Sequence, residues 1–146
     1  MKGSVFVDTN VLVYARDSGE ATKQRQAQGW LQALWESRRG VLSYQILHEY
    51  YVTVTRKLKP GMTKEEARQD VRALLAWTPV VVDRPVLDAA WRIEDRYGLS
   101  WWDSLVVGAA QKAGARYLLS EDLQSGMDLD GIRVVHPFAQ EFGELD

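Results

Sequence analysis

Short apolar runs alternate along the chain with longer segments in which apolar residues recur at helical spacing. The runs predict five strands, at Val5–Val7, Val41–Ser43, Val80–Val82, Tyr117–Leu119 and Arg133–Val135. The runs are continuous rather than alternating with polar residues, which is typical of strands buried on both faces of a parallel sheet.

The segments between the strands predict helices, over approximately 22–37, 44–57, 63–76, 85–97 and 100–113. Glycines end several of them, and Thr63 with Glu66 forms a capping-box pattern. Strands that alternate with helices predict an α/β fold, a three-layer α/β/α sandwich around a mostly parallel sheet of four to five strands. The length of 146 residues fits a single domain, residues 1–146.

Composition excludes several classes of protein. Hydrophobic residues make up 46% and charged residues 26%, as in a folded globular protein. The absence of cysteine excludes disulfides, thiolate zinc sites and cysteine nucleophiles. No apolar stretch approaches the ~18 residues that span a membrane. The N-terminal segment lacks the layout of a signal peptide, so we expect a cytoplasmic protein with no membrane partner.

Charge is distributed unevenly along the chain. The net charge of −2 gives no overall case for binding a polyanion, but residues 121–146 carry a net −6 and residues 1–120 a net +4. Such a body could hold a polyanion locally, although solvated helix faces are the more ordinary explanation. The basic residues in question are Lys23, Arg25, Arg38, Arg39, Arg56, Lys57, Lys59, Lys64, Arg68 and Arg72.

Two acidic residues follow predicted strands. Asp8 comes directly after the first strand, and Asp122 comes shortly after the fourth. Parallel α/β sheets bind ligands at the carboxyl ends of their strands, so both are candidate ligands. Asp8 is equally well explained as the cap of a turn or helix formed with Thr9 and Asn10. Glu121 competes with Asp122 for the same role.

Two further candidates lie in predicted helices. Asp103 shares its helical face with Val106 and Val107, so its carboxylate is expected on the packed side, where an unpaired charge is costly. A capping box with Ser100 is the alternative. Glu49 projects away from the apolar stripe of its helix, and an exposed glutamate is the ordinary expectation there.

The residue types at these positions point to phosphate chemistry. Carboxylates gathered at one point repel each other and need a shared cation. A cluster of hard oxygen ligands suits Mg²⁺ or Mn²⁺, and Thr9 and Ser120 could add hydroxyl groups. The two histidines, His48 and His136, have no partner at zinc spacing and are expected to be structural or exposed.

A pair of tryptophans, Trp101 and Trp102, precedes Asp103 directly. One ring could shield the acid and the other could stack on a base or a partner. Core packing is the more ordinary use of both rings.

Four short segments together resemble the PIN-domain nucleases, in particular the VapC-like toxins of bacterial toxin–antitoxin systems. The segments are Val5–Leu12, Leu42–Glu49, Tyr97–Leu105 and Leu118–Leu123. Each is unspecific by itself, but four in this order at fitting separations are specific. The match covers almost the whole chain.

The resemblance implies a PIN-like fold and a metal-dependent endoribonuclease that hydrolyses RNA to a 5′-phosphate and a 3′-hydroxyl, with Mg²⁺ or Mn²⁺ as cofactor. It selects Asp122 over Glu121 and gives Glu49 a role that its position alone does not. The catalytic and metal-binding residues it implies are Asp8, Glu49, Asp103 and Asp122. The supporting polar residues are Thr9, Asn10 and Ser120.

The resemblance also implies partners, namely an RNA substrate, a cognate antitoxin protein and a second copy in a homodimer. Aromatic residues could supply contact surface, although core packing competes for them. They are Trp30, Trp35, Tyr50 and Tyr51.

Three alternatives stay open at this point. The first is a housekeeping RNA-processing PIN nuclease without an antitoxin, and the second is a PIN scaffold that binds RNA or protein without cleaving. The third is another acidic-pocket fold. A haloacid-type phosphatase would need an aspartate at the position of Asn10, and a receiver domain would need a lysine after a late strand, where Arg116 and Arg133 do not fit.

Overall fold

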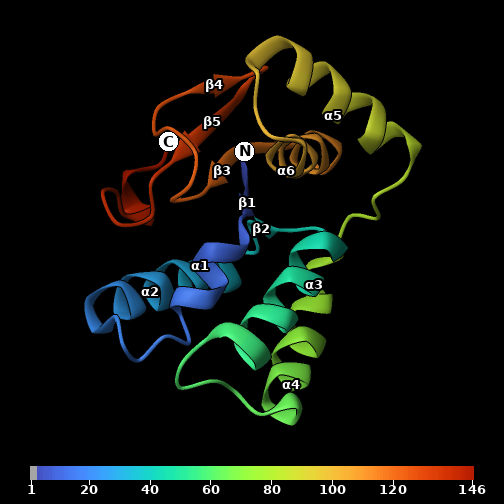
Figure 1. The fold of residues 1–146 in the computed structure, drawn as a ribbon. Coiled ribbons are helices and arrows are strands. Elements are labelled where there is room, and N and C mark those ends of the chain that lie inside the picture. The colour runs from blue at the N-terminus through green and yellow to red at the C-terminus, as the bar shows by residue number, and fades with distance from the viewer. Residues whose placement is uncertain (1–2) are drawn as a thin grey trace.

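The computed structural model describes residues 3–146, so Met1 and Lys2, part of the N-terminal segment considered above, lie outside the described residues. A five-stranded sheet in the order β2-β1-β3-β5-β4 forms the centre (Figure 1). The strands are β1 Ser4–Val7, β2 Gly40–Val41, β3 Ala115–Leu119, β4 Asp128–Leu129 and β5 Ile132–Val135. All pairs are parallel except β4 with β5, which confirms the mostly parallel sheet.

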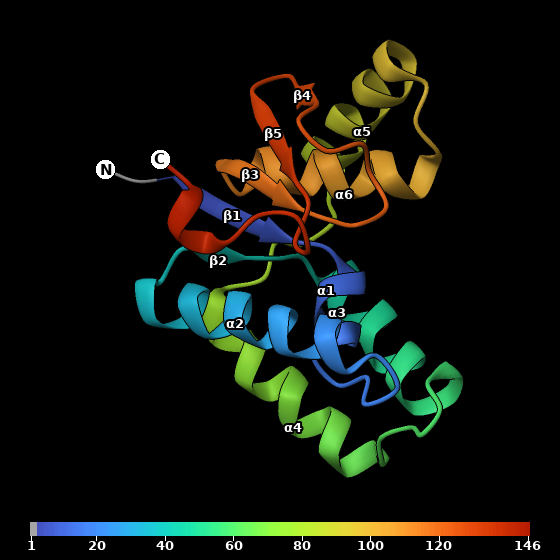
Figure 2. The same ribbon diagram turned by 90° about the vertical axis from the view of Figure 1, so that its left-hand side faces the viewer.

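Helices cover both faces of this sheet, which confirms the three-layer α/β/α architecture. In Figure 2, α5 and α6 lie on one side of the sheet and α1 to α4 on the other. The helices are α1 Thr9–Tyr14, α2 Ala21–Ser37, α3 Tyr44–Val52, α4 Lys64–Leu74, α5 Arg84–Tyr97 and α6 Trp101–Lys112. A π-helical turn, Thr53–Lys57, extends α3, and short 3₁₀ turns form at Leu75–Trp77 and Phe142–Glu144. Across residues 3–146 we find no helix long and apolar enough to cross a membrane.

The helix boundaries follow from capping residues in the sequence. Ser43 caps α3 by accepting a hydrogen bond from the Ile46 N–H, and Thr63 caps α4 in the predicted capping box. Gly98, with a φ of 66°, ends α5 in the left-handed conformation that glycine adopts without strain. These caps fix where each helix begins and ends relative to the sheet edge.

The apolar run of β1 is buried, as its continuous apolar pattern predicts. Val5, Phe6 and Val7 are all 0% exposed, between the two helical layers. Because β1 lies between β2 and β3, the residues after these strands meet at one edge of the sheet.

The prediction of a strand at Val80–Val82 is wrong. Only Val80 pairs, in an isolated bridge with Ser43, and Val81 is 56% exposed. The neighbouring strand β2 is only two residues long, so it offers Val80–Val82 few backbone partners. The segment is also limited at its other end, because Asp83 is the N-cap of α5. Two elements, α1 and β4, are present that the apolar pattern did not predict.

Candidate metal and catalytic site

Asp8 lies at the centre of the carboxyl edge of the sheet. It follows β1 and is the N-cap of α1, its Oδ1 accepting the Thr9 N–H at 2.8 Å. Its Oδ2 accepts hydrogen bonds from the Ser120 hydroxyl at 2.7 Å and from the Asn10 amide at 3.3 Å. With 6% of its surface exposed, Asp8 is both a helix cap and a buried carboxylate, so the two explanations of this residue are compatible.

Asn10 joins Asp8 to the loop after β3. Its Nδ2 also donates to Asp122 Oδ2 at 3.2 Å, and its Oδ1 accepts the Glu121 N–H at 3.2 Å. The Ser120 hydroxyl oxygen accepts the Asp122 N–H at 3.2 Å. Asn10 and Ser120 therefore hold Asp8 and Asp122 in one hydrogen-bonded network.

Glu49 joins the same edge from α3. Its Oε2 accepts the Thr9 hydroxyl at 2.8 Å, and its Oε1 accepts the Gln45 amide at 2.8 Å. The residue is half-buried, so the expectation of an exposed glutamate is wrong. The reason is a long-range contact, since Thr9 lies 40 positions earlier in the chain. Gln45 is a supporting residue that the sequence reading missed, although its spacing of four from Glu49 is a signal for such a pair.

Asp103 lies in the first turn of α6, and the direction of α6 decides where this turn lies relative to the sheet. Ala113 and Gly114 connect α6 to β3, so α6 runs opposite to β3 and its first turn lies near the carboxyl end of that strand. The Asp103 N–H donates to Ser100 Oγ at 3.1 Å. Within residues 3–146 its carboxylate makes no hydrogen bond or ion pair, so only half of the expected capping box forms and the carboxylate stays free.

The charge of Asp8 is disfavoured by its surroundings. Burial raises the pKa of Asp8 from 3.8 to about 6, with Asp122 and Glu49 adding to the rise against the hydrogen bonds from Ser120 and Thr9. Throughout residues 3–146 no lysine or arginine pairs with any of the four candidate acids, whereas Asp83, Glu121 and Asp146 have such partners.

The donor chemistry of the site fits a hard divalent cation, because carboxylate, hydroxyl and amide oxygens gather at one edge. Among the described residues no three acids or histidines converge closely enough to form a ready metal-binding group. Hydrogen bonds through Thr9, Asn10 and Ser120 thus join Asp8, Glu49 and Asp122, while Asp103 lies at the start of α6 without a contact to them among the described residues.

Glu121 is used differently from its neighbour Asp122. Lys23 donates to its Oε2 at 2.8 Å and the Tyr14 hydroxyl donates to its Oε1 at 2.9 Å. Burial acts to raise the pKa of Glu121, but these hydrogen bonds lower it below the ordinary value. Glu121 therefore anchors the loop, and Asp122 is the residue of the pair that faces Asn10 and Asp8.

The histidines take no part in the acidic network. His48 is exposed on α3. His136 follows β5, and its Nδ1 accepts the Phe138 N–H at 3.1 Å. Their expected roles, exposed and structural, agree with these positions.

The chain belongs to the PIN domain family, whose model matches residues 5–124. This family comprises nucleases, which supports a nuclease role for the chain. No curated protein matches the sequence.

Several solved structures share this fold. A toxin–antitoxin complex from Klebsiella pneumoniae shares 19% identity at a TM-score of 0.61, over 95% of this chain and 100% of that chain. FitAcB from Neisseria gonorrhoeae shares 19% identity at a TM-score of 0.69, over 93% and 99%. VapC20 from Mycobacterium tuberculosis, a toxin that cleaves the sarcin–ricin loop, shares 21% identity at a TM-score of 0.55, over 79% and 87%. At these identities the likeness establishes the fold.

Proposed function

We propose that the protein is a metal-dependent endoribonuclease that hydrolyses RNA phosphodiester bonds and acts as the toxin of a toxin–antitoxin pair. The observation that supports this proposal is the hydrogen-bonded network that joins Asp8, Glu49 and Asp122. Neither these three acids nor Asp103 has a cationic side-chain partner within residues 3–146. Buried or clustered charges of one sign need a compensating charge. A divalent cation supplies it.

Asp8, Glu49 and Asp103 are the proposed ligands of Mg²⁺ or Mn²⁺, with Asp122 binding directly or through water. When bound, such an ion lowers the pKa of a coordinated water and offsets charge on the phosphate. The chain's own polar residues orient the ligands. Ser120 and Asn10 fix Asp8, while Thr9 and Gln45 each hold one oxygen of Glu49.

His48 lines the same cavity as Glu49, but among the described residues neither histidine forms a hydrogen bond with any of the four acids. Proton removal from the attacking water therefore depends on the carboxylates and on the lowered pKa of that water. RNA with an accessible backbone, single-stranded or looped, is the proposed substrate.

The test is cleavage of a mixed single-stranded RNA pool with Mg²⁺, Mn²⁺ or EDTA. Wild type should cut with either metal and stop in EDTA, and Asp8→Asn should not cut. Cutting in EDTA would contradict the metal requirement, and undiminished cutting by Asp8→Asn would contradict the assigned site.

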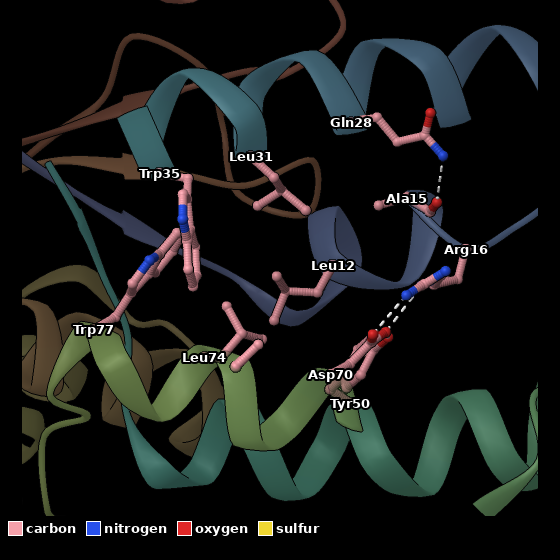
Figure 3. Close-up of a pocket in the computed structure, with 11 residues that line it drawn as sticks. Leu12, Ala15, Arg16, Gln28, Leu31, Trp35, Tyr50, Asp70, Leu74 and Trp77 are labelled. Atoms are coloured by element: carbon pink, nitrogen blue, oxygen red, sulfur yellow. Dashed lines mark hydrogen bonds and ion pairs between the residues drawn. The ribbon is translucent and has the colours of Figure 1, made fainter. Parts of the chain in front are cut away.

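The toxin role is supported by the similarity to toxin–antitoxin structures. An apolar groove between α1, α2, α3 and α4 offers a surface for an antitoxin helix, and it encloses about 350 Å³ (Figure 3). Its apolar lining consists of Leu12, Ala15, Leu31, Trp35, Ala73, Leu74 and Trp77.

Expression of wild type in a bacterial host should arrest growth, and expression of Asp8→Asn should not. Normal growth with active enzyme would favour a housekeeping nuclease instead.

A homodimer is also proposed, but only part of the aromatic set predicted from the sequence is accessible for it. Trp30 and Tyr50 are 3% and 2% exposed, so neither can contact a second copy. The α3–α4 face, where Tyr51 and Leu75 line a shared hollow and Leu75 is 43% exposed, remains available. Leu75→Lys should shift light scattering from dimer to monomer mass if this face is the interface.

A further inference from the structure

The fold uses five of its six tryptophans for packing. Trp30 is buried and donates to the Pro137 carbonyl at 2.8 Å. Trp35 packs against Trp77 with ring centroids 5.9 Å apart, and Trp91 stacks on Trp101 at 6.2 Å. Trp102 is the exception within residues 3–146, since it has no ring partner and is 65% exposed.

Trp102 forms one wall of a cavity of about 670 Å³ between α6 and α3. Leu105 of α6, Tyr44 and His48 of α3, and Val82 also line it. Tyr44 is itself 40% exposed, so two aromatic rings are presented to the same space. An exposed apolar surface of this kind next to polar groups is typical of a binding site.

The cavity is continuous with the acidic site, because Glu49 is also part of its lining. A molecule bound in it would lie beside one of the proposed metal ligands. Gln45 lines the cavity too, donating its amide to Glu49, while its Oε1 is buried and accepts no hydrogen bond among the described residues.

We propose that this cavity binds an unpaired nucleobase of the RNA strand, stacked on Trp102, beside the phosphate that is cleaved. This inference rests on the proposed nuclease function. Stacking on an aromatic side chain is available to every base because each has a flat π-face. The flat faces of a base match the exposed ring of Trp102, and Tyr44 adds a second aromatic ring to the same cavity. Trp102 is therefore a substrate-positioning residue that selects unpaired RNA over duplex.

The first test is steady-state cleavage of a short single-stranded RNA by Trp102→Ala, Trp102→Tyr and wild type. Trp102→Ala should raise KM about 5- to 150-fold, the range expected for loss of one stacked base, with kcat changed little. Trp102→Tyr should restore most of the affinity. Val52→Ala is the control, because Val52 is another exposed apolar side chain, 38% exposed, and should leave KM unchanged.

The second test replaces one base at a time by an abasic position on either side of the cut. For wild type, one abasic position should raise KM about as much as Trp102→Ala does. For Trp102→Ala, the same position should add nothing further, because the ring and the base act as one pair. Additive losses would overturn the subsite.

Two other outcomes are separable. If wild type cuts RNA and Trp102→Ala cuts with the same KM, the subsite is wrong while the nuclease assignment stands. If wild type cuts no RNA with Mg²⁺ or Mn²⁺, the proposed function itself fails. The competing explanation is that Trp102 packs on a second copy of the chain. Light scattering of Trp102→Ala tests this explanation, because a change from dimer to monomer mass would support it and overturn the nucleobase subsite.

Discussion

Asp8 and Asp70 are two carboxylates set among helices in neighbouring parts of the molecule, and they are balanced in different ways. Asp70 on α4 receives the Arg16 guanidinium, with Nε donating to its Oδ2 at 2.8 Å and Nη2 to its Oδ1. The Tyr50 hydroxyl also donates to Oδ2 (Figure 3). Asp8 receives only neutral donors, from Thr9, Asn10 and Ser120.

The difference separates an acid whose charge is matched within the chain from an acid whose charge is not. The charge of Asp70 is matched within the chain by a bidentate arginine, which ties the end of α1 to α4. The charge of Asp8 is opposed by burial and by two more carboxylates, which raises its pKa to about 6. A site that keeps an unbalanced negative charge is suited to bind a cation from outside.

The largest expected effect comes from removing the unbalanced charge. Asp8→Asn and Asp103→Asn should each lower metal-dependent RNA cleavage by about 100-fold or more. Loss of a metal-binding carboxylate removes several kcal/mol of transition-state stabilisation, and each ~1.4 kcal/mol is tenfold in rate. Asp88→Asn, at an acid paired with Arg84 on the surface of α5, is the control and should keep its rate. Equal cleavage rates for wild type and all three variants would contradict the distinction between the unpaired acids and the paired ones.

The pH dependence of stability gives the next effect, measured in EDTA. The pKa of Asp8 is raised in the folded state, so the folded protein holds this proton between pH 3.8 and about 6 while the unfolded chain has released it. The unfolding free energy of wild type should therefore fall as pH rises through this window, by up to about 3 kcal/mol relative to Asp8→Asn. Urea titrations of both proteins at pH 4 and pH 7 measure this difference. A constant difference would show that Asp8 is not desolvated.

Removing the cation that balances Asp70 should lower stability and leave RNA cleavage unchanged. Arg16→Met leaves Asp70 without its cation and should destabilise the fold by about 1–2 kcal/mol, a modest value because Arg16 is half exposed. RNA cleavage by the folded protein should be unaffected. Loss of cleavage with full stability would mean that the Asp70 cluster, and not only the Asp8 network, serves catalysis.

The smallest effect is expected at Glu121. Because Lys23 and Tyr14 already engage both of its oxygens, Glu121→Gln should change the cleavage rate less than about threefold. Asp122→Asn should lower it about tenfold, as for a residue that orients a metal ligand. Measuring both variants at limiting Mn²⁺ decides which of these adjacent acids serves the site.

The sequence predicted those parts of the fold and site that depend on local pattern. The buried run Val5–Val7, the cap at Thr63 and the position of Asp8 after a strand all follow from nearby residues. Glu49 could not be placed correctly from its own helix, because its partner Thr9 comes from another element.

Other features depend on packing between distant segments. Val80–Val82 has the composition of a strand, but a two-residue neighbour leaves it almost nothing to pair with. Trp101 and Trp102 are identical in type and adjacent in sequence. Only the position of α5 determines that the first ring stacks on Trp91 while the second remains exposed.

The most direct test of the central claim is titration calorimetry of Mn²⁺ into metal-free protein at pH 7.5. Wild type and Asp70→Asn should both bind the ion, and Asp8→Asn should bind it at least tenfold more weakly. Binding that is unchanged in Asp8→Asn, or absent in wild type, would contradict the account of the unbalanced carboxylates as a metal site.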